Sequence, residues 1–178
     1  MSEKKKVIAI SGSTRSCSTN LNLIKAIANL SANNFEITIF DGLTEILHFN
    51  PDLDNENPPK QIAAFRNILR KFDGILICTP EYAMGVPGTL KNAIDWTVSS
   101  MEFSGKPTAL ITASSVGQKG HSSLLETLKI IDAQITDETQ LLIPFAKTKI
   151  NNDCLITDGQ TLAEIKSLIN SFDKLMRN

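Results

Sequence analysis

The amino-acid sequence predicts a single α/β domain in which a parallel sheet carries helices on both faces. Short apolar runs rich in β-branched residues alternate with segments whose apolar residues recur at helical spacing. Right-handed crossovers between parallel strands place helices on both faces of such a sheet, which makes the fold doubly wound. The chain of 178 residues has no internal repeat and no shift of composition, so one domain over residues 1–178 is expected.

Five runs have the length and composition of strands. Residues 7–10 are Val-Ile-Ala-Ile followed by Ser-Gly, and residues 74–79 form a similar continuous run before Pro80. Unbroken apolar runs of this kind are typical of strands that are covered on both faces. The other three expected strands are residues 35–40, 108–112 and 140–143.

Five further segments carry helical periodicity. The expected helices span residues 23–30, 62–72, 90–98, 124–131 and 161–176. Pro59 and the Pro87-Gly88 pair precede the second and third helices, where proline suits a helix start. Ser123, with Glu126 three residues later, forms a possible capping box at the start of the fourth helix. Residues 41–60, rich in Asn, Asp and Pro, are expected to form a long functional or mobile loop.

Charge and composition exclude several function classes. Eighteen Lys and Arg against nineteen Asp and Glu leave a net charge of −1, so no nucleic acid or anionic membrane is expected as a partner. No stretch approaches the roughly 18 apolar residues of a membrane span, and the apolar run behind residues 1–6 is too short for a signal peptide. Cys17, Cys78 and Cys154 contain no C-x-x-C pair, which argues against a disulfide framework or a zinc site. We therefore expect a cytoplasmic protein with reduced thiols and no metal.

The loop of residues 11–20 follows the first expected strand and is rich in hydroxyl groups. In an open α/β sheet, ligands bind beyond the carboxyl ends of the strands. Hydroxyl donors, backbone N–H groups, the start of a helix and the charge of Arg15 together suit a phosphate group. The same composition suits a plain polar turn with Ser18 as the N-cap, and the residues alone leave both interpretations open.

Other phosphate-binding motifs are absent from this loop. It contains neither G-x-x-x-x-G-K-[ST] nor G-x-G-x-x-G, which excludes a P-loop nucleotide hydrolase and gives no dinucleotide fingerprint. Arg15 precedes Cys17, whereas a cysteine phosphatase places its nucleophilic cysteine before the arginine. Ser11, Gly12 and Ser13 stand where a receiver domain would carry acidic ligands for Mg²⁺.

Two more loops follow expected strands. Residues 79–88 contain two prolines and two glycines, and their backbone could meet the edge of a planar heterocycle, with Tyr82 and Met84 as apolar walls. A merely rigid turn is the alternative interpretation. Residues 114–121, Ser-Ser-Val-Gly-Gln-Lys-Gly-His, could close the other side of the same ligand.

These motifs together resemble a known family. Gly12-Ser13-Thr14-Arg15 with Ser18 and Asn20, then Pro80-Glu81-Tyr82, Pro87-Gly88 and the Leu-Lys-Asn-Ala-Ile-Asp-Trp stretch of residues 90–96, are similar to the NAD(P)H-dependent FMN reductases. This family of flavodoxin-like proteins includes quinone, azo-dye and chromate reductases. The resemblance implies a flavodoxin-like, doubly wound, five-stranded sheet with strand order 2-1-3-4-5.

The resemblance also implies a set of FMN-binding residues. The phosphate would lie against the first loop, at Ser13, Arg15, Ser18, Thr19 and Asn20. The ring and ribityl chain would lie against the other two loops, at Pro80, Glu81, Tyr82, Ala83, Met84, Gly85, Ser114, Ser115 and Gly117. Ala83 departs from the family, which commonly has Asn there, and His121 stands where the family often has Gly.

The function implied by the resemblance is hydride transfer from NADPH or NADH to FMN, and from FMN to a quinone, an azo compound, a metal oxyanion or free flavin. No protein nucleophile or metal is needed for this chemistry. The alternatives are a flavodoxin-like FMN-binding electron carrier, which the charge of −1 and the lone Trp disfavour, and a relative that has lost flavin. A homodimer or homotetramer is implied, with Trp96 and its helix as a contact surface.

Several residues of chemically reactive types are expected to have structural rather than catalytic roles. Cys17 has no resolving partner nearby and is interpreted as a small loop residue. His48 and His121 are interpreted as loop or surface histidines rather than acid–base catalysts. Glu81 and Asp95 are expected to form structural hydrogen bonds or salt bridges, within the chain or across a subunit interface.

Overall fold

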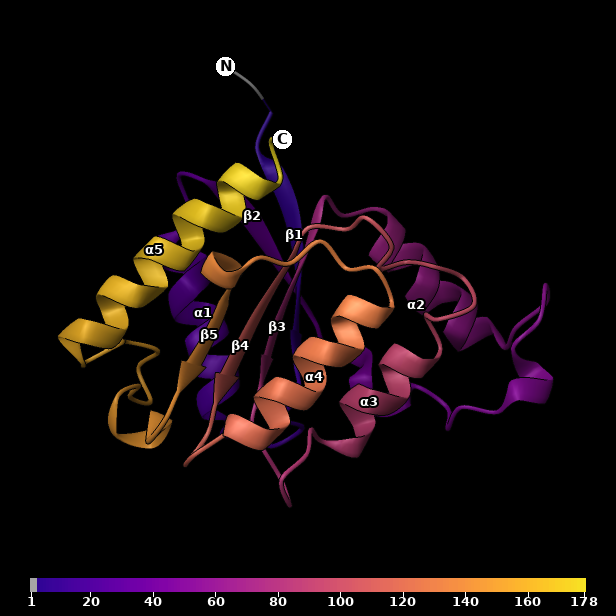
Figure 1. Ribbon diagram of the computed structural model, residues 1–178, viewed down its shortest axis with the longest axis horizontal. Helices are drawn as coiled ribbons and strands as arrows, with labels where there is room; N and C mark the ends of the chain where they lie inside the picture. The colour runs from indigo at the N-terminus through magenta and orange to yellow at the C-terminus, as the bar shows by residue number, and fades with distance from the viewer. Residues whose placement is uncertain (1–2) are drawn as a thin grey trace.

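The computed structural model describes residues 3–178; Met1 and Ser2, at the start of the lysine-rich stretch, lie outside the described residues. Five parallel strands form one sheet with the order β2-β1-β3-β4-β5 (Figure 1). The strands are β1 Lys5–Ser11, β2 Phe35–Phe40, β3 Gly74–Thr79, β4 Thr108–Ala113 and β5 Gln140–Ile143. The predicted fold class and strand order are therefore confirmed.

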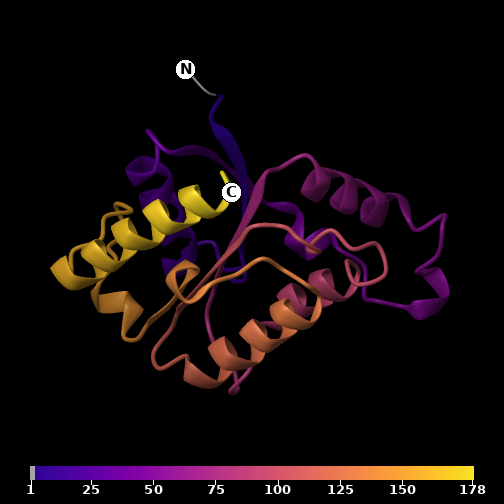
Figure 2. The same ribbon diagram turned by 45° about the horizontal axis from the view of Figure 1, so that its top comes forward.

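Helices cover both faces of the sheet, as Figures 1 and 2 show. The helices are α1 Thr19–Leu30, α2 Lys60–Arg70, α3 Gly88–Asp95, α4 Gln118–Ile130 and α5 Gly159–Leu175. Helices α1 and α5 pack on one face, and α2, α3 and α4 pack on the other. Every residue of β3 and β4 is buried, because both strands lie between the two helical layers.

The two cores follow from the alternation of side chains along a strand. In β1, Val7 and Ala9 point toward α1 and α5, whereas Ile8 and Ile10 point toward the other layer. The first face is completed by residues such as Phe172 of α5, and the second by residues such as Phe65 of α2. Burying these side chains on both faces is the main favourable term in folding.

The start of α4 differs from the prediction. The helix begins at Gln118, and Ser123 lies inside it rather than at its N-cap. The N-cap is Gly117, whose φ of 90° lies in the left-handed region that glycine adopts without strain. A Cβ at this position would also stand 2.9 Å from Leu142 and 3.0 Å from Thr112. The Ser123–Glu126 pattern is therefore not a capping box in this fold.

Trp96 is buried inside the chain, so the expectation that it forms a subunit contact is wrong. Its exposed fraction is 0%, and its indole N–H donates a hydrogen bond to the Leu47 carbonyl at 2.7 Å. The ring of Phe49 packs edge-on against it with the centroids 5.0 Å apart, and the Arg66 guanidinium lies 5.9 Å from its centroid. Trp96 thus holds part of the long segment 41–59 against the body of the protein.

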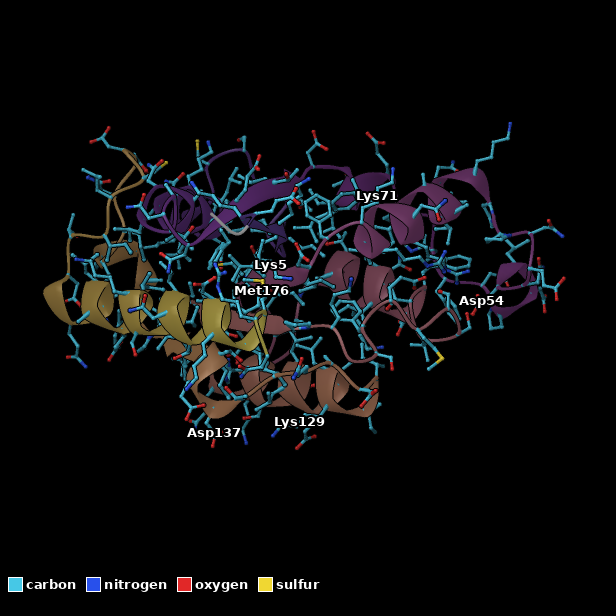
Figure 3. The ribbon with its side chains drawn as sticks, turned by 90° about the horizontal axis from the view of Figure 1, so that it is seen from above. Lys5, Asp54, Lys71, Lys129, Asp137 and Met176 are labelled. Atoms are coloured by element: carbon cyan, nitrogen blue, oxygen red, sulfur yellow. The ribbon has the colours of Figure 1, made fainter. Side chains whose placement is uncertain are left out.

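Segment 41–59 contains two short 3₁₀ helices, η1 Gly42–Glu45 and η2 Pro51–Leu53, and reaches the end of the molecule where Figure 3 labels Asp54. Arg66 of α2, which is 5% exposed, forms an ion pair with Asp54 at 2.6 Å. The Ser99 hydroxyl donates to the same carboxylate at 2.7 Å. Burial alone raises the pKa of Asp54, but the hydrogen bonds from Arg66 and Ser99 outweigh it and hold the pKa below its usual range.

The carboxyl ends of the parallel strands share one edge of the sheet, and the start of β1 and the end of α5 lie toward the opposite edge (Figure 1). The loops after β1, β3, β4 and β5 therefore meet at the edge away from the start of β1 and the end of α5. Within residues 3–178, no helix combines the length and apolarity that crossing a membrane would require.

Candidate functional site

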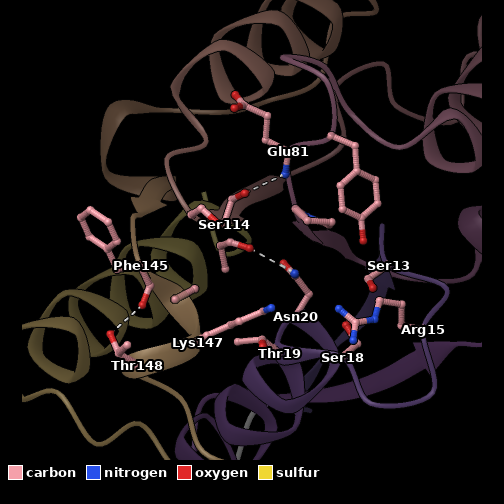
Figure 4. A pocket seen from close by; sticks show the side chains of 15 residues that line it. Ser13, Arg15, Ser18, Thr19, Asn20, Glu81, Ser114, Phe145, Lys147 and Thr148 are labelled. Carbon is pink, nitrogen blue, oxygen red and sulfur yellow. Dashed lines mark hydrogen bonds between the residues drawn. The ribbon is translucent and has the colours of Figure 1, made fainter.

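A cavity of about 360 Å³ lies at the carboxyl ends of β1, β3, β4 and β5 (Figure 4). Its volume lies within the range of sites for small molecules and cofactors, about 300–1,000 Å³. Ten residues expected from the sequence line it. They are Ser13, Arg15, Ser18, Thr19, Asn20, Pro80, Glu81, Tyr82, Ser114 and Ser115.

The first loop combines both interpretations that its residues left open. The Ser18 side chain is the N-cap of α1 and accepts a hydrogen bond from the N–H of Leu21 at 3.3 Å. The first turn of a helix has N–H groups without intrahelical partners and carries partial positive charge, here at Thr19 and Asn20. Arg15 lines the cavity beside this turn. The loop is thus both a capped turn and a site with the donors that a phosphate requires.

Gly12 allows the backbone of this loop to lie directly against the end of β3. Its N–H donates to the carbonyl of Cys78 at 2.8 Å, which extends the pairing of β1 and β3 by one residue. A Cβ on Gly12 would stand 2.2 Å from Thr79 Oγ1 and 2.7 Å from its Cβ. Glycine is required here because no side chain would fit between the loop and the strand.

Asn20 lines the cavity while its amide holds the ends of two strands together. Its Nδ2 donates to the Ala113 carbonyl at 3.1 Å, and its Oδ1 accepts from the Cys78 thiol at 3.3 Å (Figure 4 shows the first of these bonds). Burial raises the pKa of Cys78, so the thiol stays protonated and acts as a donor. Asn20 therefore positions the start of α1 against β3 and β4.

The second loop contains a tight turn at residues 82–85. The N–H of Tyr82 donates to the Gly85 carbonyl at 2.8 Å, and the N–H of Gly85 donates to the Tyr82 carbonyl at 2.9 Å. Ala83 and Met84 have φ values of 48° and 60°, as the two central residues of a type I′ turn do. Such turns favour Asn and Gly, so Ala and Met store backbone strain here. Ala83, Met84 and Gly85 do not line the cavity.

Glu81 joins the second loop to the third. Its backbone N–H donates to the Ser114 hydroxyl at 3.2 Å, and its carboxylate accepts from the N–H of Gly120 at 2.6 Å. Figure 4 shows the carboxylate directed away from the Arg15 end of the cavity. The expected structural role of Glu81 is confirmed within the chain, and the bond supplies α4 with a capping acceptor from another loop.

A fourth loop, which the sequence reasoning missed, completes the cavity. The N–H groups of Phe145 and Ala146 donate to the carbonyls of Ser115 and Ser114 at 3.1 and 3.0 Å, so this loop lies directly against the third. The missed lining residues are Ala113, Phe145, Ala146, Lys147 and Thr148. The rule that ligands lie beyond strand ends points to this loop as well, because β5 ends at Ile143. Gly117, although expected in the site, does not line the cavity.

The remaining candidate acids and bases lie outside the cavity. His121 is half-buried, and its ring nitrogens lie 2.9 Å from Thr112 Oγ1 and 3.1 Å from Gln140 Oε1. Burial lowers its pKa, and the hydrogen bond with Gln140 offsets only part of this shift. Asp95 forms an exposed ion pair with Lys91 at 2.6 Å, as expected of a structural carboxylate. Among residues 3–178, no group of three His, Cys, Asp or Glu side chains is placed to hold a metal ion.

The cavity has different chemistry at its two ends. Arg15, Lys147 and the hydroxyl groups around the start of α1 provide the donors and positive charge that a phosphate requires. Tyr82 and Phe145, exposed by 50% and 66%, provide aromatic surface at the rim. The residues present therefore fit a ligand that carries a phosphate and a planar ring, as flavin mononucleotide does.

Comparison with known proteins gives a consistent result. The model of the family described as NADPH-dependent FMN reductase matches residues 5–148. An NAD(P)H-dependent FMN reductase of Pseudomonas aeruginosa is 31% identical over 183 residues, covering 99% of this chain and 98% of its own length. A quinone reductase of Escherichia coli K12 is 28% identical over 185 residues, covering 99% and 98%.

The fold has a similar counterpart among solved structures. The flavoenzyme NAD(P)H:acceptor oxidoreductase FerB of Paracoccus denitrificans superposes with a TM-score of 0.83. The superposition covers 97% of each chain at 23% sequence identity. At this identity the likeness concerns the arrangement of strands and helices.

Proposed function

Because the chain belongs to the NADPH-dependent FMN reductase family, we propose that the cavity at the carboxyl edge of its sheet holds FMN and that the preferred acceptor is a quinone. The protein is an NAD(P)H-dependent oxidoreductase that uses FMN and reduces a small molecule. The relatives named as quinone reductases support the choice of acceptor.

One observation carries the assignment of the site. Arg15, the hydroxyl groups of Ser13 and Thr19, and the first turn of α1 lie around one cavity with Tyr82 and Ser114. The donors at the first turn of α1 would hold the phosphate, and the loops after β3 and β4 would hold the ring. The other expected residues, Ala83, Met84, Gly85 and Gly117, would act by shaping these two loops.

The chain itself contributes binding and orientation. FMN bound in this cavity would supply the hydride-transfer chemistry between the nicotinamide nucleotide and the acceptor. The hydrogen bonds of Glu81 to Ser114 and Gly120 fix the second and third loops relative to each other. Tyr82 and Met84, exposed by 50% and 76%, lie on the second loop, where they would flank an acceptor entering from solvent.

The proposal also covers the domain organisation, the cellular compartment and the oligomeric state of the protein. We propose that residues 1–178 act as one flavodoxin-like FMN-binding domain and that the domain works in the cytoplasm, where its three free cysteines would stay reduced. We also propose a homodimer or homotetramer. The exposed apolar side chains of Tyr82, Met84, Val116 and Phe145 on the cavity loops support association on that side.

An anaerobic absorbance experiment tests the function. The purified protein is reconstituted with FMN, and the flavin absorbance band is followed on addition of NADPH, NADH and then a quinone. The proposal expects loss of the band within seconds and its return with the quinone. A protein that binds no flavin contradicts the assignment of the site, and bound flavin that neither nucleotide reduces contradicts the proposed arrangement for hydride transfer. Sedimentation velocity of the same sample tests the oligomer.

A further inference from the structure

The fourth loop places a lysine at the cavity. Lys147 lies in the short 3₁₀ helix η4, Ala146–Thr148, just beyond the carboxyl end of β5. Two hydrogen bonds connect this loop to the third loop, as described above, and two more stabilise it internally. In the latter, the N–H and the hydroxyl of Thr148 donate to the Phe145 carbonyl at 3.0 and 2.9 Å. The backbone that carries Lys147 is therefore held in place by the sheet edge.

The side chain of Lys147 extends from this loop toward the first turn of α1. Figure 4 shows its side chain extending across the cavity in the direction of Asn20 and Thr19, with Arg15 on the other side of that turn, and all four residues line the cavity. Within residues 3–178, the ammonium of Lys147 takes part in no ion pair. It is thus available to a ligand between the two cations.

The charges around the cavity point to an anionic ligand at this position. Arg15 and Lys147 are its two cationic side chains, and Glu81 is its one carboxylate. That carboxylate is hydrogen-bonded to the N–H of Gly120 and directed away from Arg15. Two positive charges and the N-terminus of α1 therefore act together at the end of the cavity away from its one lining carboxylate, which suits a phosphate monoester carrying close to two negative charges.

We propose that Lys147 is a phosphate-binding residue of the flavin site, on the opposite side of the phosphate from Arg15. The proposal rests on the proposed function, because it takes the ligand of the cavity to be FMN. It assigns a fourth loop to the cofactor site in addition to the three loops after β1, β3 and β4. The contact is with the phosphate and not with the ring, so it distinguishes FMN from riboflavin.

Flavin titrations of the full-length protein test this role. Apoprotein is titrated with FMN and, separately, with riboflavin, and binding is followed by the change in flavin fluorescence. Lys147→Gln should raise the Kd for FMN about tenfold, the loss expected for one charge-assisted contact, and leave the Kd for riboflavin unchanged. Lys147→Arg should restore most of the FMN affinity. Lys166→Gln, at an exposed position of α5 outside the cavity, is the matched control and should bind both flavins as the wild type does.

Salt dependence gives a second readout. The FMN affinity of the wild type should fall more steeply with salt concentration than that of Lys147→Gln, because the variant has lost one of the two cations. Equal losses of FMN and riboflavin affinity, or an unchanged FMN affinity in Lys147→Gln, would overturn the role of Lys147 while leaving the proposed function intact. A wild-type protein that binds neither flavin would overturn both.

Discussion

The Glu81 carboxylate accepts a hydrogen bond from the N–H of Gly120 at 2.6 Å, although 39 residues separate the two in the chain. The bond gives α4 an acceptor at its first turn that its own N-cap, Gly117, lacks. A negative charge at a helix N-terminus is favourable because of the helix dipole. One contact therefore positions the second loop, the third loop and the start of α4 together.

Substitution of Gly120 should disturb this arrangement. A Cβ at Gly120 would stand 3.1 Å from Glu81 Cγ and 3.1 Å from the Gly85 carbonyl oxygen, so Gly120→Ala should lower the free energy of unfolding by about 1–2 kcal/mol. Gly159→Ala, in the first turn of α5, has no atom within 4 Å of its Cβ and should be neutral or slightly stabilising. Urea denaturation measures the free energy of unfolding of both variants. Equal changes in Gly120→Ala and Gly159→Ala would show that the site of Gly120 accommodates a methyl group.

Substitution at Ala83 should relieve strain in the turn of residues 82–85. Asn adopts left-handed φ values more readily than Ala, so Ala83→Asn should raise the free energy of unfolding by about 0.5–1 kcal/mol. The added amide should change the preference among quinone, azo and flavin acceptors more than the affinity for FMN. Ala83→Gly, which relaxes the same turn at the same position without adding an amide, is the control. Identical acceptor profiles of wild type and Ala83→Asn would show that residue 83 does not face the substrate.

Arg15 should contribute strongly to cofactor affinity. Arg15→Ala removes a guanidinium from the phosphate end of the cavity and should raise the Kd for FMN by about ten- to a hundredfold, with a smaller effect on riboflavin. A fluorescence titration measures both constants. Arg177→Ala, whose side chain pairs with Asp173 at the far end of α5, serves as the control. FMN affinity that is equal in wild type and Arg15→Ala would remove Arg15 from the site.

His121 should make stability depend on pH. Burial lowers its folded-state pKa below the ordinary value of 6.5, so below pH 6.5 the unfolded chain binds a proton that the folded chain does not. Stability should therefore be fully present above pH 6.5 and decrease as the pH falls toward the folded-state pKa. Denaturation at several pH values should show a flatter profile in this range for His121→Asn. His48→Asn, a substitution of the other histidine at an exposed position outside α4, is the matched control.

Most of the fold could be predicted because burial on two faces leaves a strong pattern in the sequence. In four of the five strands, both the first and the last residue lie within one position of the expected limits. The exception is β1, which extends back to Lys5 and Lys6 because these residues pair with Phe35 and Glu36 of β2. Their polar side chains give no apolar signal. The start of α4 was misplaced for a related reason, since its capping acceptor comes from Glu81 and not from a neighbouring residue.

The site was predicted where loop composition is distinctive and missed where it is not. Glycine, serine and proline mark the loops after β1, β3 and β4, and these loops do meet at one cavity. The loop after β5 carries only Pro144 of these residue types, and Phe145 adopts a φ of 55° without being glycine. Its place at the cavity follows from hydrogen bonds to Ser114 and Ser115, which join residues about 30 positions apart and leave no local pattern.

The burial of Trp96 gives the protein an internal optical reporter. Trp96 is the lone tryptophan of the chain, and its indole N–H is bonded to the Leu47 carbonyl. Indole emission shifts to longer wavelength when the ring enters water, so detachment of segment 41–59 from α3 would change the fluorescence of the unlabelled protein. The emission would follow that movement in real time.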